Sequence, residues 1–377
     1  MKILFLARQL NIGGAERQLV TLANELASRG HEVIIASYYP GGALSKKLDS
    51  KRVRLISLGK RSRWDLLPFY VRLVRVVRQE QPAVLHGWMH TQNFFATMAW
   101  IFNRNVKLFW SVRSSQLKLN FVASIEDWLR LLLSRFPDCI VVNSLAGLEY
   151  AASTGIPRAK MLYIPNGIDT ALFYPDAELG QQVRAEWSIS GSEKVIGYVA
   201  RFDPMKNHTL YLKAAARIAA ERPEARFVCA GHGSTSYLKE LQDLTRALGI
   251  ESKVRWVQAR PDITAMYNAF DVFCSASLTE GFPNVIGEAM ACGRRCVVTD
   301  VGDCRLVVGD TGVVVPSNDV EALTAGLRQA LDAGDSLNLP ARQRILENFT
   351  VAQLADRTEQ ALTSWPIADQ ERLSAFS

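Results

Sequence analysis

Several familiar features are missing from this sequence. It has no apolar run long enough to cross a membrane, no Cys-x-x-Cys pair among its six cysteines, and no short repeat or coiled-coil heptad. The glycines that follow its first apolar segment do not form the Gly-x-Gly-x-x-Gly fingerprint of dinucleotide-binding proteins. These absences argue against a membrane-spanning protein, a zinc site, a repeat protein and an NAD-dependent enzyme.

What is present is typical of a globular protein with two domains. The 377 residues exceed the size of one ordinary core, and the composition, 48% hydrophobic and 21% charged, excludes a disordered chain. The opening residues, MKILFLARQ, form too short an apolar segment for a signal peptide and predict a buried first strand. We interpret the six cysteines as buried free thiols, which places the protein in the reducing cytoplasm.

Strand-like and helix-like segments alternate along the chain, which indicates parallel, doubly wound sheets. The alternation stops near Ile164, in the stretch YIPNGIDTALFYPD, and restarts at KVIGYVA. The sequence therefore predicts an α/β protein with two Rossmann-like domains whose strand-end loops face a cleft. We place the N-terminal domain at 1–165, the C-terminal domain at 166–350, and a final segment at 351–377.

Positive charge is concentrated in the first half of the chain. Residues 1–165 carry 23 basic and 10 acidic residues, whereas the remainder carries 21 and 27. Eleven of the basic residues lie between Lys46 and Arg78. Such a segment could bind nucleic acid, dock on an anionic membrane, or form the solvated face of a helix. The membrane interpretation draws on the apolar residues within it: Trp64, Leu66, Leu67, Phe69, Tyr70 and Leu73.

Two cations lie where a phosphate group would be bound. Arg201 follows the predicted strand KVIGYVA, and Lys206 opens the helix that comes next. A strand-end arginine and a helix-start lysine can converge on one anion, which the positive end of the helix also attracts. The pair therefore predicts a diphosphate site; the alternative is two unrelated surface cations.

Glycines follow two predicted strands. Gly13 and Gly14 separate the first strand from the first helix, and Gly231 begins the stretch GHGS after the strand ARFVCAG. Glycine lets the backbone approach a ligand closely and exposes its N–H groups. Each of these loops taken alone is a weak signal, and together they mark candidate donor-binding loops.

Two glutamates eight residues apart frame the turn Gly-Phe-Pro-Asn. Glu280 lies on a loop, and Glu288 lies in an early turn of the helix that Pro283 begins. Such carboxylates can accept hydrogen bonds from ribose or sugar hydroxyls. They could instead be a glycosidase acid–base pair or helix-start acids favoured by the helix dipole. The cations at 201 and 206 favour the first interpretation, because they suit an anionic leaving group that needs no protonation.

No Asp-x-Asp occurs in the chain, although a metal-dependent nucleotide-sugar site would commonly use one. We therefore expect no metal and no cofactor, with Arg201 and Lys206 neutralising the charge of a leaving diphosphate.

Four stretches in order resemble the retaining glycosyltransferases of the two-Rossmann (GT-B) architecture. They are GGAERQ, IPNGID…LFYP, GYVARFDPMKN and SLTEGFPNVIGEAMACG, and the resemblance runs from about Lys2 to Pro316. The family is that of family 4, which includes bacterial polysaccharide and lipopolysaccharide transferases. The resemblance implies a nucleotide-sugar donor held by the C-terminal domain, an acceptor held by the N-terminal domain, and a final helix near 350–367 that crosses back to the N-terminal domain.

The resemblance also implies roles for individual residues. Arg201 and Lys206 would bind the diphosphate, Glu288 the ribose, and Glu280 the donor sugar. The donor sugar would also touch the backbone of Gly281, Phe282, Pro283 and Asn284, while Gly13 and Gly14 would approach the donor phosphates and the acceptor.

One position departs from many relatives. They carry a histidine after the strand VKLFWSV, where this chain has Arg113. A histidine base at this point is therefore in doubt. His90, in the neighbouring loop LHGWMHTQN, could contact acceptor or donor, and a purely structural role is open for both His86 and His90.

The sequence thus predicts a retaining, metal-independent hexosyl- or N-acetylhexosaminyltransferase that uses a UDP- or GDP-sugar. The acceptor would be a glycan or a lipid-linked glycan in cell-surface polysaccharide biosynthesis, reached by peripheral contact with the inner face of an anionic membrane, and nucleic acid would not be a partner. A nucleotide-sugar epimerase of the same architecture and a non-catalytic nucleotide-sugar-binding module are the alternatives.

Overall fold

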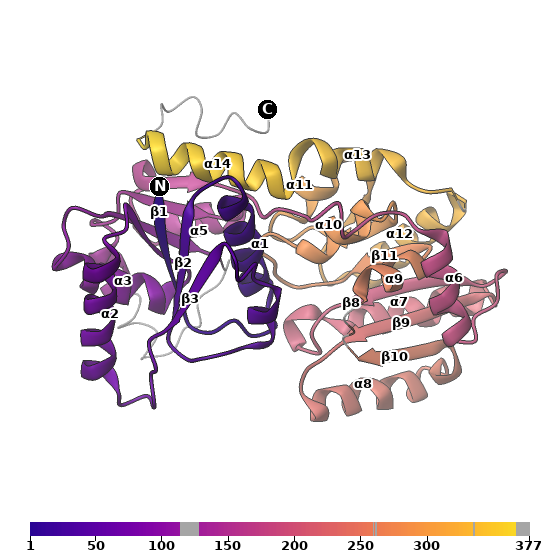
Figure 1. Ribbon diagram of the computed structural model, residues 1–377. Helices are drawn as coiled ribbons and strands as arrows, with labels where there is room; N and C mark the ends of the chain where they lie inside the picture. The colour runs from indigo at the N-terminus through magenta and orange to yellow at the C-terminus, as the bar shows by residue number, and fades with distance from the viewer. Residues whose placement is uncertain (114–127, 259, 261, 335, 367–377) are drawn as a thin grey trace. The chain divides into compact units, whose positions relative to one another are not determined.

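The computed structural model describes residues 1–113, 128–258, 260, 262–334 and 336–366. The chain divides into two compact units, one made of Met1–Gly167 together with the segment from Val351 onward, the other of Ile168–Thr350. Each unit is built on one parallel sheet with connecting helices, many of which are labelled in Figure 1. The α/β architecture with two Rossmann-like parallel sheets is therefore confirmed.

The first unit contains seven parallel strands in the order β3-β2-β1-β4-β5-β6-β7. The order reverses between β1 and β4, which pair with Ile3 opposite Val84. The strands are β1 (Lys2–Ala7), β2 (Glu32–Ser37), β3 (Val53–Ser57), β4 (Val84–Gly87), β5 (Lys107–Val112), β6 (Cys139–Val142) and β7 (Met161–Tyr163). The helices and turns are α1 (Gly14–Ser28), η1 (Ala43–Lys47), α2 (Leu66–Glu80), α3 (His90–Ile101), α5 (Leu145–Ser153), η2 (Arg158–Lys160) and α14 (Val351–Ser364).

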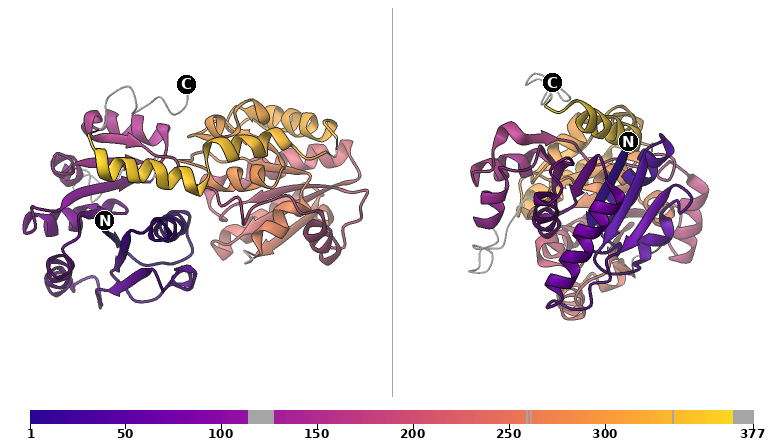
Figure 2. Two further views of the ribbon diagram at one scale, coloured as in Figure 1. Left: turned by 45° about the horizontal axis from the view of Figure 1, so that its top comes forward. Right: turned by 60° about the vertical axis from the view of Figure 1, so that its left-hand side comes forward.

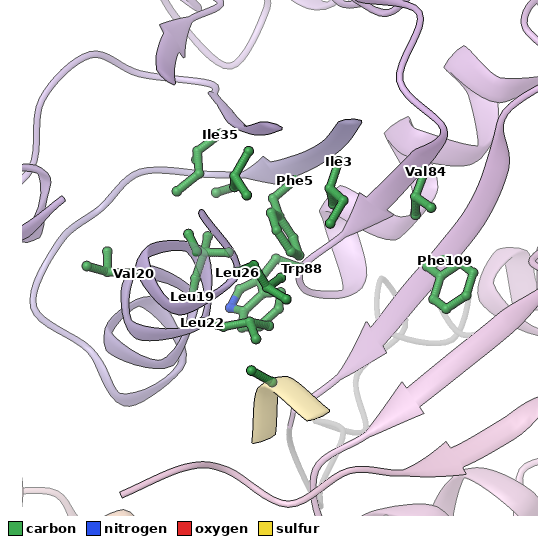
Figure 3. Close-up of a cluster of buried hydrophobic side chains, with 14 of the residues drawn as sticks. Ile3, Phe5, Leu19, Val20, Leu22, Leu26, Ile35, Val84, Trp88 and Phe109 are labelled. Atoms are coloured by element: carbon green, nitrogen blue, oxygen red, sulfur yellow. The ribbon is translucent and has the colours of Figure 1, made fainter. Parts of the chain in front are cut away.

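The core of this unit explains why its strands read as continuous apolar runs. Ile3 and Phe5 of β1 and Leu22 of α1 are fully or almost fully buried, and Figure 3 shows these side chains gathered between the sheet and α1. A strand in a parallel sheet is covered on both faces, so both sets of alternating side chains are apolar.

Helix α14, yellow in Figure 2, packs on the first unit although it follows the second in sequence. Leu354 and Leu362 belong to the same buried cluster as β1 and α1. Arg29, the residue after the end of α1, lies 2.7 Å from the Glu359 carboxylate, and His31 lies 2.6 Å from the same side chain. Apolar burial, the Arg29–Glu359 ion pair and the His31–Glu359 contact together hold α14 against α1 and the residues that follow it.

The second unit contains six parallel strands in the order β10-β9-β8-β11-β12-β13. The order reverses between β8 and β11, so the chain continues from these neighbouring strands toward opposite edges of the sheet, and ligands commonly bind at such a point. The strands are β8 (Lys194–Val199), β9 (Ala225–Gly231), β10 (Val254–Gln258), β11 (Val272–Ser275), β12 (Arg295–Thr299) and β13 (Val313–Val315).

Helices and short turns connect these strands. The helices are α6 (Ala177–Glu186), α7 (His208–Glu221), α8 (Thr235–Ala247), α9 (Ile263–Ala269), α10 (Asn284–Ala291), α11 (Cys304–Val308), α12 (Val320–Asp332) and α13 (Leu339–Asn348). The turns are η3 (Pro204–Lys206), η4 (Glu251–Lys253) and η5 (Gly309–Thr311).

All six cysteines are buried and free, as the sequence predicts. Burial raises the pKa of the Cys292 thiol to about 12, so it stays protonated and unreactive. Among the described residues, no helix combines the length and apolar character needed to cross a bilayer. The same residues contain no group of three or more His, Cys, Asp or Glu side chains arranged to hold a metal ion.

His208 opens α7 inside an apolar environment. It is fully buried between the rings of Tyr198 and Phe202, whose centroids lie 4.8 and 5.2 Å from its own. Neither ring nitrogen has a hydrogen-bond partner in the part of the chain that the structure describes. Burial, and secondly the charge of Lys206, lower the pKa of His208 to about 4.

This buried histidine predicts a measurable loss of stability in acid. Below about pH 6.5 the unfolded chain binds a proton that the folded chain excludes, so stability falls by about 1.4 kcal/mol per pH unit toward pH 4. We expect His208→Phe to remove this contribution, and its melting temperature should fall less than that of the wild type between pH 7.5 and 5. The other titrating groups are common to both proteins. An equal decrease in melting temperature for the wild type and the variant between pH 7.5 and 5 would therefore contradict the assignment.

Candidate functional site

Two loops of the second unit meet at the point where the strand order reverses. One, residues 200–207, follows β8, and the other, residues 276–283, follows β11. The Leu278 N–H donates to the Met205 carbonyl at 2.9 Å, which ties the loops together. This junction brings together Lys206 and Glu280, two of the residues that the sequence singled out.

Lys206 and Glu280 are in direct contact. The Lys206 Nζ lies 2.5 Å from Glu280 Oε1, and the side chains are 20% and 11% exposed. The Ser277 hydroxyl donates to the same Oε1 at 2.7 Å. Both charged groups are largely shielded from water. Solvent therefore screens their interaction less than it screens a surface ion pair. The pair places a cation and a carboxylate at one edge of the sheet.

The local conformation holds Lys206 in place. It is the last residue of η3, and the Met205 N–H donates to the Asp203 carboxylate at 2.9 Å to cap that turn. Asn207 has a φ of 49°, a left-handed conformation that separates η3 from α7. The expected helix start is therefore displaced by two residues, and Lys206 lies on a turn before the helix.

Arg201 lies on the same loop but in a different environment. Its side chain is 63% exposed, and its guanidinium lies 3.5 Å from the Asp203 carboxylate. An exposed ion pair at this distance is weak, so Arg201 can readily exchange the Asp203 carboxylate for another anion. The structure thus places Arg201 on the loop that carries Lys206, with its charge open to solvent.

Glu288 is more deeply buried than the sequence suggested. It lies in the second turn of α10, only 2% of its surface is exposed, and its Oε2 accepts a hydrogen bond from the Tyr267 hydroxyl at 2.8 Å. Tyr267, in α9, is itself fully buried. A buried carboxylate needs such a donor, but nothing in the sequence near Glu288 identified Tyr267.

The loop before α10 is held by the backbone of a neighbouring loop. The Asp303 N–H donates to the Gly281 carbonyl at 3.1 Å. Gly302 has a φ of 54°, and a Cβ there would lie 2.2 Å from the Glu280 carbonyl. Gly302 is thus needed at this close approach, and the sequence reasoning had not identified it.

The remaining residues of this loop were predicted donor contacts. Phe282 is buried, and its ring lies 5.5 Å from that of Phe349. Asn284 begins α10 and Pro283 is the residue before it, so the helix starts one residue later than expected from the sequence. The packing of Phe282 fixes the loop, and the donor contacts stay a prediction.

Gly231 has a structural explanation. A Cβ at Gly231 would lie 1.9 Å from the Ala200 carbonyl, and one at Gly233 would lie 2.2 Å from that of Phe202. The Phe202 N–H also donates to the His232 carbonyl at 2.8 Å. The glycines therefore let this loop pair with the loop of Arg201, and a donor contact at Gly231 stays a prediction.

Gly13 and Gly14 form the start of α1 in the first unit. Gly13 is the residue before the helix, with an extended backbone, and Gly14 is its first residue. A Cβ at Gly13 would lie 2.2 Å from a carboxylate oxygen of Glu16. Gly13 thus leaves room for that carboxylate beside the helix start.

Arg113 lies in a polar and aromatic environment at the end of β5. Its Nη1 donates to Asn166 Oδ1 at 2.9 Å, and its guanidinium carbon lies 3.6 Å from the centroid of the Trp88 ring. Burial lowers the pKa of Arg113 to about 9. Asn166 and Trp88 were not recognised as partners from the sequence. Residues 114–117, which follow Arg113, lie outside the described residues.

The two neighbouring histidines differ. His86 is buried, its Nε2 lies 2.9 Å from the Ser111 hydroxyl, and burial and then Arg113 lower its pKa to about 3. His86 is therefore a neutral, packed residue at neutral pH. His90 begins α3 and is half-buried. Its predicted contact with acceptor or donor stays a prediction.

Comparison with known proteins matches each unit to a glycosyltransferase profile. Residues 12–172 match the profile described as "Glycosyltransferase Family 4", and residues 181–349 match "Glycosyl transferases group 1". The chain belongs to the family 4 glycosyltransferases. HepE from Anabaena, solved in complex with UDP, superposes on 97% of this chain and 100% of its own with a TM-score of 0.86 at 21% identity. That likeness supports the GT-B fold.

Curated relatives match over different lengths. A D-inositol 3-phosphate glycosyltransferase of Mycobacteroides abscessus is 34% identical over 192 residues, which are 49% of this chain and 42% of that protein. A Campylobacter jejuni GalNAc-alpha-(1->4)-GalNAc-alpha-(1->3)-diNAcBac-PP-undecaprenol alpha-1,4-N-acetyl-D-galactosaminyltransferase is 28% identical over 299 residues, 77% of each chain. The chain therefore spans less than half the length of the first of these relatives.

The glycine contacts predict a stability effect that needs no ligand. We expect Gly231→Ala to destabilise the second unit by about 1–3 kcal/mol, because its Cβ would collide with the backbone of Ala200. Thermal unfolding of the ligand-free protein measures this loss. Gly191→Ala is the matched control, since no atom lies within 4 Å of a Cβ there. Equal melting temperatures for the two variants would refute the packing role.

Proposed function

We propose that this glycosyltransferase moves a hexosyl or N-acetylhexosaminyl group from a UDP- or GDP-sugar to an acceptor hydroxyl, with retention and without a metal ion. The observation that carries the proposal is the contact between Lys206 and Glu280 at the strand-order reversal. A donor bound there would present its diphosphate to Lys206 and its sugar to Glu280. Arg201, exposed on the same loop, would bind the diphosphate from the solvent side.

The chemistry needs no nucleophile from the protein. As the bond between the anomeric carbon and the diphosphate oxygen breaks, negative charge grows on the diphosphate, and the Lys206 ammonium stabilises it. The acceptor oxygen forms its bond on the same face of the sugar, and its proton passes to a donor phosphate oxygen. Lys206 and Arg201 thus act on the leaving group, while binding orients the two substrates.

The remaining predicted contacts serve to orient the donor. We assign the ribose to Glu288, whose carboxylate already accepts from Tyr267 and would then be shared between the two. We assign the donor sugar to Glu280 and to the backbone of residues 281–284, with Gly231 beside the phosphates. The second unit is then the donor-binding part of the chain.

The first unit would bind the acceptor. Gly13 and Gly14 at the start of α1 would approach the phosphates and acceptor, and His90 and Arg113 would line the acceptor side. We infer a lipid-linked glycan of cell-surface polysaccharide synthesis as the acceptor, and the undecaprenol in the name of the Campylobacter relative is in keeping with it.

A surface of the first unit favours such an acceptor. Trp64, which precedes α2, and Leu67, in the first turn of α2, are 78% and 72% exposed. A groove of about 490 Å³ adjoins the helix and is lined by Tyr70, Val71, Val74, Arg75, Arg78, Gln79 and Phe102. Exposed apolar side chains beside arginines are suited to an anionic lipid surface. We infer peripheral contact with the inner face of the cytoplasmic membrane.

The phosphate assignment predicts a large loss of turnover in Lys206→Ala. A thermal-shift panel of UDP-, GDP-, ADP- and CMP-sugars first identifies the donor, which should raise the melting temperature. With that donor we expect Lys206→Ala to reduce turnover by roughly 10²–10³-fold. Lys213→Ala, which removes an exposed lysine from α7, is the control. Unchanged turnover in a folded Lys206→Ala protein would refute the assignment, and donor interconversion without acceptor would indicate an epimerase instead.

The membrane assignment predicts charge-dependent binding to vesicles. The wild type should float with phosphatidylglycerol-containing liposomes at low salt, and the double variant Arg75→Ala/Arg78→Ala should bind them less, because each cation contributes about 1 kcal/mol near such a surface. Lys213→Ala/Lys239→Ala removes the same charge from the second unit and should bind like the wild type. Equal binding of the wild type to neutral and anionic liposomes would exclude an electrostatic dock.

A further inference from the structure

Four residues of the second unit form a closed circuit of polar contacts behind the proposed diphosphate site. The Tyr198 hydroxyl lies 2.5 Å from the Lys206 carbonyl and 3.2 Å from the Ser277 hydroxyl. Ser277 in turn donates to Glu280, and the Lys206 ammonium contacts the same carboxylate oxygen. The circuit thus joins both the backbone and the ammonium of Lys206 to one set of partners.

The protons can be assigned from the distances. Each hydroxyl has one proton to donate. The Ser277 proton goes to the charged Glu280 oxygen at 2.7 Å, and the Tyr198 proton goes to the nearer acceptor, the Lys206 carbonyl. Burial raises the pKa of Tyr198 well above its usual value, so the phenol stays protonated and can act as this donor.

The two hydroxyl residues are more rigidly held than the two charged ones. Tyr198 and Ser277 are fully buried, and the Thr299 hydroxyl donates to the Ser277 carbonyl at 2.7 Å. Lys206 and Glu280 retain some exposure. The circuit therefore has a fixed, dry side and a side that a ligand can reach.

We propose that Tyr198 and Ser277 are positioning residues that set Lys206 and Glu280 for the β-phosphate of a nucleoside diphosphate. Tyr198 fixes the backbone from which the lysine side chain extends. Ser277 satisfies part of the Glu280 charge, so the carboxylate orients the ammonium without binding it so strongly that a phosphate cannot compete. The inference rests on the proposed function, since it presupposes that Lys206 meets a phosphate.

A neighbouring tyrosine provides a matched control. Tyr211 is also fully buried, its ring centroid lies 5.4 Å from that of Tyr198, and its hydroxyl also donates to a backbone carbonyl, that of Ile196, at 2.7 Å. Loss of either hydroxyl removes one buried hydrogen bond and should lower stability by a similar amount. Only loss of the Tyr198 hydroxyl frees Lys206.

The test compares the affinities of UDP and UMP, and of GDP and GMP, by calorimetry on the full chain. The diphosphate-to-monophosphate affinity ratio isolates the β-phosphate contact and needs no acceptor. We expect Tyr198→Phe to lower the diphosphate-to-monophosphate affinity ratio for the preferred base roughly three- to tenfold. This loss is smaller than the full contribution of one hydrogen bond to a charged group, because the variant keeps Lys206 itself. UMP or GMP affinity should not change, and Tyr211→Phe should leave both quantities at wild-type values.

The serine is tested in the same way with a second pair. We expect Ser277→Ala to lower the ratio and Ser277→Thr, which keeps the hydroxyl, to restore it. Ser275→Ala is the control, because that buried hydroxyl has no hydrogen-bond partner among the described residues. A role in folding alone would lower the melting temperature and leave the ratio unchanged.

The outcomes separate the two proposals. If Lys206→Ala lowers the ratio while Tyr198→Phe and Ser277→Ala behave like their controls, the positioning role is wrong and the diphosphate site stands. If Lys206→Ala also leaves the ratio unchanged, or if the wild type binds the diphosphates no better than the monophosphates, the diphosphate site itself is wrong.

Discussion

The contact between the Lys206 ammonium and the Glu280 carboxylate is the interaction on which the site of the second unit depends. Each of these groups loses hydration at the sheet edge, and each would be costly there without the other. If the two charges compensated each other completely, Lys206 would not bind an anionic ligand. The Ser277 hydroxyl donates a hydrogen bond to the carboxylate and so weakens its hold on the ammonium. Tyr198 separately holds the backbone of Lys206 by donating to its carbonyl. The cation is thereby kept in place and still able to exchange partners.

Sheet topology makes this contact available. Strands β8 and β11 are neighbours, but the chain continues from them toward opposite edges of the sheet. The loops that follow the two strands are joined by the hydrogen bond from the Leu278 N–H to the Met205 carbonyl. Glycines at 231 and 302 allow two further loops to approach the same region at backbone distance. Close packing of backbone segments thus helps to hold the site in place.

The strands and the two sheets could be predicted from the sequence, because burial on both faces gives each strand a continuous run of apolar residues. The runs KILFLA and EVIIAS coincide with β1 and β2 in full. The location of Lys206 and Glu280 on loops at the carboxyl ends of their strands also followed, since these ends lie at one edge of a parallel sheet, whereas their direct contact was not predicted. These predictions rest on local patterns that each strand carries by itself.

The partners of the site residues could not be predicted. Tyr198 meets Ser277 across 79 positions, and Asn166 meets Arg113 across 53. Neither pair has a spacing that marks it, because such contacts arise only when separate strands are placed side by side. The deep burial of Glu288 has the same origin: it depends on Tyr267, which another helix supplies.

The position of α14 has a consequence for the order in which the protein becomes complete during synthesis. The first unit begins at the N-terminus, yet part of its apolar cluster comes from Leu354 and Leu362. A ribosome therefore releases the whole second unit before the surface of α1 is covered. Until then, the nascent first unit exposes apolar side chains that chaperones recognise, and the continuous second unit is the part able to finish folding first.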